Sequence, residues 1–240
     1  MSGVNFIIWQ PWGGLGDNLQ FSTLPEQLTK AGNDVYLSTI NAYRNIEIFD
    51  IVWKTNPWIK GFSQLPPNCG WIGCDPHIQY PNRHIFGINK WENLYGAPLT
   101  AGIPRIYWEP PRMSGLENTV LVDLSYTSCE HYEYTTMPVV YSEIAKRWPD
   151  ANPLQVTFAN KNVCAKRFKS KFQEIQFKDI WDYSIHIANC RAIVTLLSGA
   201  SPLASALKFQ NPLPDILTIK KWWYTEGQIF PNADFVDELK

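Results

Sequence analysis

Three features are missing from this sequence: long hydrophobic runs, clusters of basic residues and closely spaced cysteine pairs. Because no stretch of roughly 18 apolar residues occurs, we expect no membrane span, although peripheral contact with a membrane stays open. The net charge is −1 and no run of Lys or Arg stands out, which argues against a nucleic-acid-binding protein. A single phosphorylated ligand is compatible with this charge.

The five cysteines are too scattered to predict a zinc site. The closest two, Cys69 and Cys74, lack the CxxC spacing. The opening residues, MSGVNFIIWQPW, also lack a basic segment followed by a long apolar stretch. We therefore expect reduced thiols, a cytoplasmic location and no bound metal.

The composition is that of a folded protein. Hydrophobic residues make up 45% of the 240 residues and charged residues 18%, which favours a packed core over disorder. This length suits one large domain or two modest ones.

The first part of the chain predicts a strand, a glycine-rich turn, a helix and a second strand. The apolar run at 4–9 (VNFIIW) suits a buried strand, and the turn GGLGDN follows at 13–18. Apolar positions over 21–31 share one helical face, with Pro25 predicting a kink or a helix that restarts after Thr23. With a strand at 35–38, this order predicts the βαβ unit of a parallel sheet.

The rest of the chain divides at a long irregular stretch. Residues 46–63 suit a helix and a strand, whereas 65–112 is crowded with Pro, Gly, Asn and aromatic residues, as in a functional or linking segment. We place the boundary at its end, which gives domains 1–110 and 111–240. In the second domain we expect strands at 119–124, 154–158, 192–197 and 216–219, and helices at 139–148, 180–188 and 203–207.

The first candidate site is the turn at 13–18. Glycines after a buried strand allow positive-φ turns and close approach to a ligand, and the next helix aims free N–H groups at the same space. The pattern is not a dinucleotide fingerprint, because Leu19 stands where the third glycine belongs, and no P-loop Lys-Ser/Thr follows. The turn therefore disfavours a hydride-transfer enzyme.

Asp17 is the most informative residue of this turn. One interpretation makes it the N-cap of the following helix, where its carboxylate accepts backbone N–H bonds. The other makes it a general base that deprotonates an acceptor hydroxyl while a phosphate leaving group departs. Both roles are compatible with the sequence.

The second candidate site is the turn SGASP at 198–202. We expect Ser201 at the N-cap and Pro202 at the first helical position. Small residues would leave room for an anion against the helix N-terminus, with serine hydroxyls as additional donors. An ordinary strand-to-helix turn is the alternative. One such turn opens each half, as expected of two nucleotide-binding-like halves.

Two stretches resemble a known family. GGLGDNLQFSTLPEQLTKAGNDVYLS, at 13–38, resembles the start of the family-9 glycosyltransferases, the heptosyltransferase group of lipopolysaccharide synthesis. IWDYSIHIANCRAIVTLLSGASPLASAL, at 180–207, resembles the C-terminal nucleotide-sugar signature of that family. Their order and spacing along the chain also fit the family.

The resemblance implies an α/β protein of GT-B type, with two Rossmann-like domains whose parallel sheets face each other across a cleft. It implies an inverting, metal-independent transferase without a cofactor, with a nucleotide-diphosphate sugar as donor and a glycan or glycolipid hydroxyl as acceptor. The acceptor would bind the first domain and the donor the second. Asp17 matches the catalytic base of the family. The substrate-binding residues would be Gly13, Gly14, Gly16, Asn18, Gln20, Ser125, Thr127, Ser198, Gly199, Ala200 and Ser201.

Two alternatives stay open. Leu197 and Pro202 stand where the family usually has Asp and His, which favours a non-catalytic nucleotide- or sugar-binding relative with the same fold. An NAD(P) enzyme with a Rossmann-like fold is the other alternative, and the missing third glycine argues against it.

Overall fold

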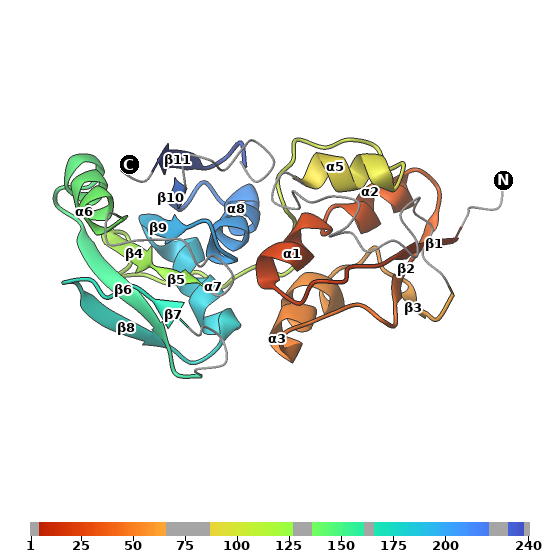
Figure 1. Cartoon of the computed structure of the whole chain (residues 1–240), viewed down its shortest axis with the longest axis horizontal. Coiled ribbons are helices and arrows are strands. Elements are labelled where there is room, and N and C mark those ends of the chain that lie inside the picture. The colour runs from red at the N-terminus through yellow and green to blue at the C-terminus, as the bar shows by residue number, and fades with distance from the viewer. Residues whose placement is uncertain (1–4, 66–86, 127–135, 161–165, 221–229, 238–240) are drawn as a thin grey trace. The chain divides into compact units, whose positions relative to one another are not determined.

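The computed structural model describes residues 5–65, 87–126, 136–160, 166–220 and 230–237. Internal contacts divide the chain into two compact units, which are described separately (Figure 1). Unit 1 comprises residues 1–108 and 225–231, and unit 2 comprises 109–224 and 232–240. Within the described ranges, every helix is too short or too polar to cross a membrane.

Unit 1 is built on a small parallel sheet of three strands in the order β1-β2-β3. Ile7 pairs with Tyr36, and Leu37 with Phe62, so the carboxyl ends of neighbouring strands meet at one edge. The described elements are β1 (Asn5–Ile8), α1 (Leu15–Gln20), α2 (Leu24–Lys30), β2 (Asp34–Ser38), α3 (Ile46–Phe49), the π-helical turn η1 (Asp50–Lys54), β3 (Gly61–Ser63) and α5 (Ile88–Leu94).

The predicted break in the first helix is confirmed. α1 ends at Gln20, and α2 starts at Leu24 with Thr23 as its N-cap and Pro25 near its first position. Proline is tolerated there because the N–H it lacks would have no helical partner anyway. Gly32 has φ of +90° just beyond the helix, a conformation that favours glycine and ends α2.

Unit 2 contains a six-stranded parallel sheet in the order β8-β6-β4-β9-β10-β11. Counted along the chain, this order is 3-2-1-4-5-6, that of a doubly wound nucleotide-binding sheet. The elements are β4 (Thr119–Asp123), β5 (Ser125–Tyr126), α6 (Thr136–Arg147), β6 (Asn152–Phe158), β7 (Lys166–Arg167), β8 (Gln173–Phe177), α7 (Ile180–Asn189), β9 (Ala192–Leu196), α8 (Ala200–Gln210), β10 (Asp215–Lys220) and β11 (Asp234–Asp237).

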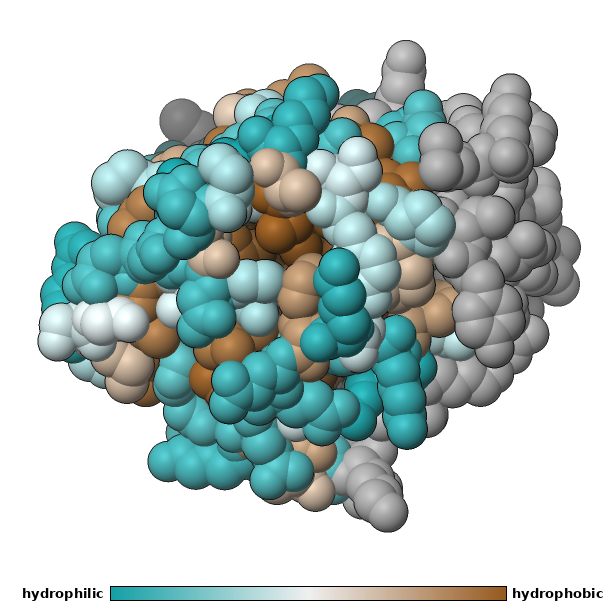
Figure 2. Space-filling view, turned by 90° about the vertical axis from the view of Figure 1, so that its left-hand side faces the viewer, coloured by the Kyte–Doolittle hydropathy of each residue, from teal (hydrophilic) through white to brown (hydrophobic). Residues whose placement is uncertain are grey.

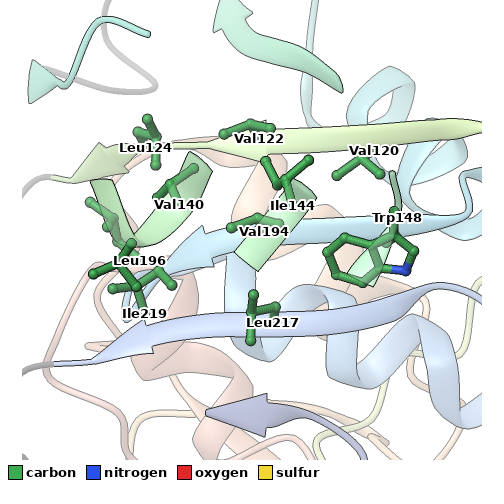
Figure 3. Close-up of a cluster of buried hydrophobic side chains, with 12 residues drawn as sticks. Val120, Val122, Leu124, Val140, Ile144, Trp148, Val194, Leu196, Leu217 and Ile219 are labelled. Atoms are coloured by element: carbon green, nitrogen blue, oxygen red, sulfur yellow. The ribbon is translucent and has the colours of Figure 1, made fainter. Parts of the chain in front are cut away.

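The core of unit 2 lies between α6 and the middle strands. Figure 3 shows alternate residues of β4, such as Val120 and Val122, on the same side as Val140 and Ile144 of α6. Side chains at every second position of a strand point to the same face of the sheet. Because β4 and β9 are apolar at nearly every position, they place buried apolar side chains on both faces.

The view onto unit 2 in Figure 2 is mainly hydrophilic, with hydrophobic side chains in small patches between polar ones.

The structure confirms the expected α/β class with parallel sheets and differs in detail. α5 lies within the 65–112 stretch that we expected to be irregular. The edge strands β8 and β11 were not predicted, because their residues are largely polar or half-exposed and lack a buried apolar run. The predicted helix at 139–148 spans 136–147 instead.

Candidate functional site

The glycine-rich turn connects β1 to α1 at the carboxyl edge of the unit 1 sheet. α1 begins at Leu15 with Gly14 as N-cap, at φ −72° and ψ 151°. Asp17 is therefore the third helical residue, and its interpretation as the N-cap is wrong. A carboxylate in the first turn is still favoured by the helix dipole. Asp17 is half-buried, so its carboxylate is not sealed inside the protein.

Lack of space, and not positive φ, distinguishes Gly13 and Gly14 of this turn. In the described part of the chain, the glycines with positive φ all lie outside the turn. A Cβ on Gly13 would lie 3.0 Å from the backbone nitrogen of Arg44. A Cβ on Gly14 would lie 2.5 Å from Oδ2 of Asp17. Gly16 is the second residue of α1. We predicted that a ligand would closely approach the backbone of these glycines. In the structure, the groups that lie close to Gly13 and Gly14 belong to the protein itself, namely Arg44 and Asp17.

Asn18 has a structural role in holding this turn together. It is 0% exposed. Its Nδ2 donates to the carbonyl oxygen of Gly14 at 2.9 Å, and its Oδ1 accepts from Nε1 of Trp53 at 2.7 Å. Gln20 is half-buried and accepts from Nε1 of Trp91 at 3.1 Å. A fully enclosed amide cannot touch a ligand in this conformation, so Asn18 supports the turn from behind.

The serine-rich turn of unit 2 connects β9 to α8. α8 begins at Ala200 with Gly199 as N-cap, so the prediction that Ser201 caps the helix is wrong, and Pro202 is the third helical residue. The hydroxyl of Ser201 lies 2.8 Å from Oγ1 of Thr218 on β10, and both residues are fully buried. Ser201 therefore joins α8 to the sheet.

Ser198 is half-exposed, and its Oγ accepts from the N–H of Ala200 at 3.4 Å.

Ser125 and Ser198 follow neighbouring strands at the same edge of the sheet. β4 and β9 are parallel partners, with Asp123 paired to Thr195. The strand order reverses between these two strands, and in open α/β sheets ligands bind outside the carboxyl ends at this switch point. The structure therefore places Ser125 and Ser198, two of the three described serines that were predicted to bind substrate, at this edge. Thr127 lies outside the described residues.

The sequence reasoning missed a buried carboxylate at this switch point. Asp123, the last residue of β4, is 3% exposed. Its Oδ2 accepts from the hydroxyl of Tyr183 at 2.6 Å, and its Oδ1 accepts from the N–H of Ser125 at 2.9 Å. Burial raises the pKa of Asp123, against these hydrogen bonds, which lower it. The signal in the sequence was an acidic residue inside the apolar run TVLVDL, which needs a partner when buried.

The described residues offer no evident metal site. Among them, no group of three or more His, Cys, Asp and Glu is placed to hold an ion. Cys190, the one cysteine within the described ranges, is a buried free thiol.

Comparisons with known proteins identify the fold. No family model and no curated protein matches the sequence. Among solved structures, the iron-containing dodecameric glycosyltransferase TibC from enterotoxigenic E. coli is 15% identical, with a TM-score of 0.65, and the match covers 98% of this chain and 63% of TibC. A glycosyltransferase family 9 protein from Veillonella parvula is 10% identical, with a TM-score of 0.61 and coverage of 98% and 86%.

A third solved structure, the E. coli heptosyltransferase WaaC with ADP, is 9% identical, with a TM-score of 0.55 and coverage of 98% and 93%. This chain therefore spans less than two thirds of TibC but most of the other two proteins. The likeness extends over nearly the whole chain and shows that this chain shares the α/β fold of these glycosyltransferases.

Proposed function

We propose that this chain is a GT-B glycosyltransferase that moves a sugar from a nucleotide-diphosphate donor to a hydroxyl of a glycan or glycolipid, with inversion and without a metal. The observation that carries the proposal is the position of Ser125 and Ser198 at the switch point of a doubly wound sheet. The fold shared with sugar transferases supports the same function. In this proposal, unit 1 takes the acceptor and unit 2 the donor.

The donor diphosphate is held by the turn before α8. This helix has eleven residues, so its N-terminus carries a partial positive charge that favours an anion. Ser198 and Gly199 are half-exposed and, in the proposal, contact the ligand together with Thr127. Ser125 is 8% exposed, so in the proposal it shapes this edge of the site and does not face the ligand openly. Ala200 and Ser201 are buried and hold the helix start in place. As the sugar leaves, these donors stabilise the charge that develops on the diphosphate.

The acceptor is activated by Asp17. Its carboxylate takes the proton of the acceptor hydroxyl while the hydroxyl oxygen forms a bond to the anomeric carbon. The bond from that carbon to the phosphate oxygen breaks with its electron pair, and the nucleoside diphosphate leaves. A single displacement of this kind inverts the configuration. Gly13, Gly14 and Gly16 shape the turn that carries Asp17, and Asn18 and Gln20 brace it.

No step of this proposal depends on a metal. TibC contains iron and was also solved with ADP-D-beta-D-heptose, but those properties are of TibC. The helix N-terminus and hydroxyl donors supply the charge stabilisation that a metal provides in other transferases.

A panel of nucleotide-sugars tests the proposal. Purified protein is heated with ADP-, GDP-, UDP-, CMP- and dTDP-sugars, because a ligand that binds only the folded state raises the melting temperature. The donor that stabilises the protein is then followed for hydrolysis and for transfer. We expect one nucleotide class to stabilise the protein and release its diphosphate. If no donor raises the melting temperature, the proposal is wrong.

A second candidate function is a non-catalytic binding protein with the same fold. Leu197 and Pro202 favour it, since both are buried and neither offers a polar group to a ligand at the positions where the family has Asp and His. A pure binding protein would be stabilised by the donor without hydrolysing it. The hydrolysis assay separates the two functions.

A further inference from the structure

The loop after β2 is fixed against the glycine turn after β1. The N–H of Ala42 donates to the carbonyl oxygen of Gln10 at 2.9 Å, and the N–H of Arg44 donates to that of Gly13 at 2.8 Å. Oδ1 of Asn41 accepts from the N–H of Gln10 at 2.8 Å. Because three hydrogen bonds join the two loops, the backbone of Arg44 has a set position relative to the start of α1.

Two charged side chains converge on Gly14. The position that a Cβ would take on this residue lies 2.5 Å from Oδ2 of Asp17 and 3.8 Å from Nη2 of Arg44. The backbone of Gly14 has φ −72° and ψ 151°, which alanine adopts without strain. Glycine leaves this space to the carboxylate and the guanidinium, and a Cβ here would force the end of the Asp17 side chain to move.

We propose that Arg44 is a positioning residue for Asp17, and that the bare backbone of Gly14 leaves the space beside which both side chains lie. The proposal rests on the function proposed for Asp17 as the base. Arg44 is exposed, and its guanidinium cation attracts the carboxylate of Asp17 beside Gly14. A guanidinium anchored through its own backbone also limits the directions that the carboxylate can take.

The contact over Gly14 is tested by a double-mutant cycle that needs no activity. Gly14→Ala places a methyl group against the carboxylate, so we expect it to lower the melting temperature in the wild-type background. In the Asp17→Ala background the carboxylate is gone, and Gly14→Ala should have little effect. Gly13→Ala is the matched control, because its methyl group meets the backbone of Arg44 and should act equally in both backgrounds. An equal effect of Gly14→Ala in both would overturn the contact.

The role of Arg44 is tested by steady-state transfer kinetics. We expect Arg44→Gln to lower kcat by about tenfold or more with little change in the KM of the donor, since a misplaced base slows the chemical step. Arg44→Lys keeps the charge and should recover part of the loss, whereas Arg112→Gln, at an exposed position of unit 2, should leave kcat unchanged. A wild-type kcat in Arg44→Gln would overturn the positioning role.

The proposed transferase function and the arrangement around Gly14 can be refuted independently of each other. A coupled Gly14 and Asp17 in a protein that neither transfers nor hydrolyses any donor would refute the proposed function and leave the contact in place. An active transferase without that coupling would refute the positioning arrangement alone.

Discussion

Removing the hydroxyl of Tyr183 should destabilise unit 2. This hydroxyl donates to the buried carboxylate of Asp123 at 2.6 Å. Leaving a buried acceptor without its hydrogen bond costs about 1–3 kcal/mol. Tyr183→Phe should therefore lower the free energy of unfolding by about 1–3 kcal/mol, which corresponds to roughly 2–12 °C in melting temperature for a protein of this size.

Asp123 also predicts how the stability of the protein changes with pH. Burial raises its pKa in the folded state, so the folded protein keeps this proton to a higher pH than the unfolded chain does. The contribution of Asp123 to stability is then fully present below the unfolded pKa and is lost as the pH rises through the folded pKa. Asp123→Asn removes the titration, so its stability relative to wild type should improve as the pH increases from about 4 towards neutrality.

Urea unfolding followed by tryptophan fluorescence at several pH values measures both effects. Tyr141→Phe serves as a control at neutral pH, because its hydroxyl accepts from the N–H of the exposed Lys171 and not from a buried acid. The reasoning is refuted if Tyr183→Phe is as stable as wild type, or if Asp123→Asn and wild type keep a constant difference in stability across the pH range.

The remaining predictions concern the helix start, the buried thiol and the metal. Ser201→Ala should cost about 1–3 kcal/mol in urea unfolding, because it leaves the buried hydroxyl of Thr218 without the bond to Ser201, and the double variant with Thr218→Val should recover part of that loss. Burial raises the pKa of Cys190 to about 12, so iodoacetamide at about pH 8 should alkylate Cys190 only after denaturation, as followed by peptide mass spectrometry. A chelator such as EDTA should leave the rate of sugar transfer unchanged, and a loss that added metal restores would contradict the metal-independent mechanism.

The main strands were predictable from their amino-acid composition. β4 and β9 are largely apolar runs, and after each a leucine and then a serine lead into the turn. The restart of the helix at Leu24 followed from Pro25, whose ring forbids an uninterrupted helix. These local rules sufficed for the α/β class.

The local geometry of the site was less predictable. Whether a helix starts at Ala200 or at Pro202 depends on contacts that the sequence does not display, such as the bond of Ser201 to Thr218, seventeen positions away. The same holds for Asp123, whose partner Tyr183 lies sixty positions along the chain. No local sequence pattern indicated that Arg44 lies near Gly14, because the pairing of β1 with β2 brings the two residues together.

The most direct test of the catalytic claim compares wild type with Asp17→Ala on the donor that the thermal screen selects. The account predicts that both proteins are folded and bind the donor with similar affinity, while only the wild type transfers the sugar to an acceptor. Transfer at the wild-type rate by Asp17→Ala would contradict it.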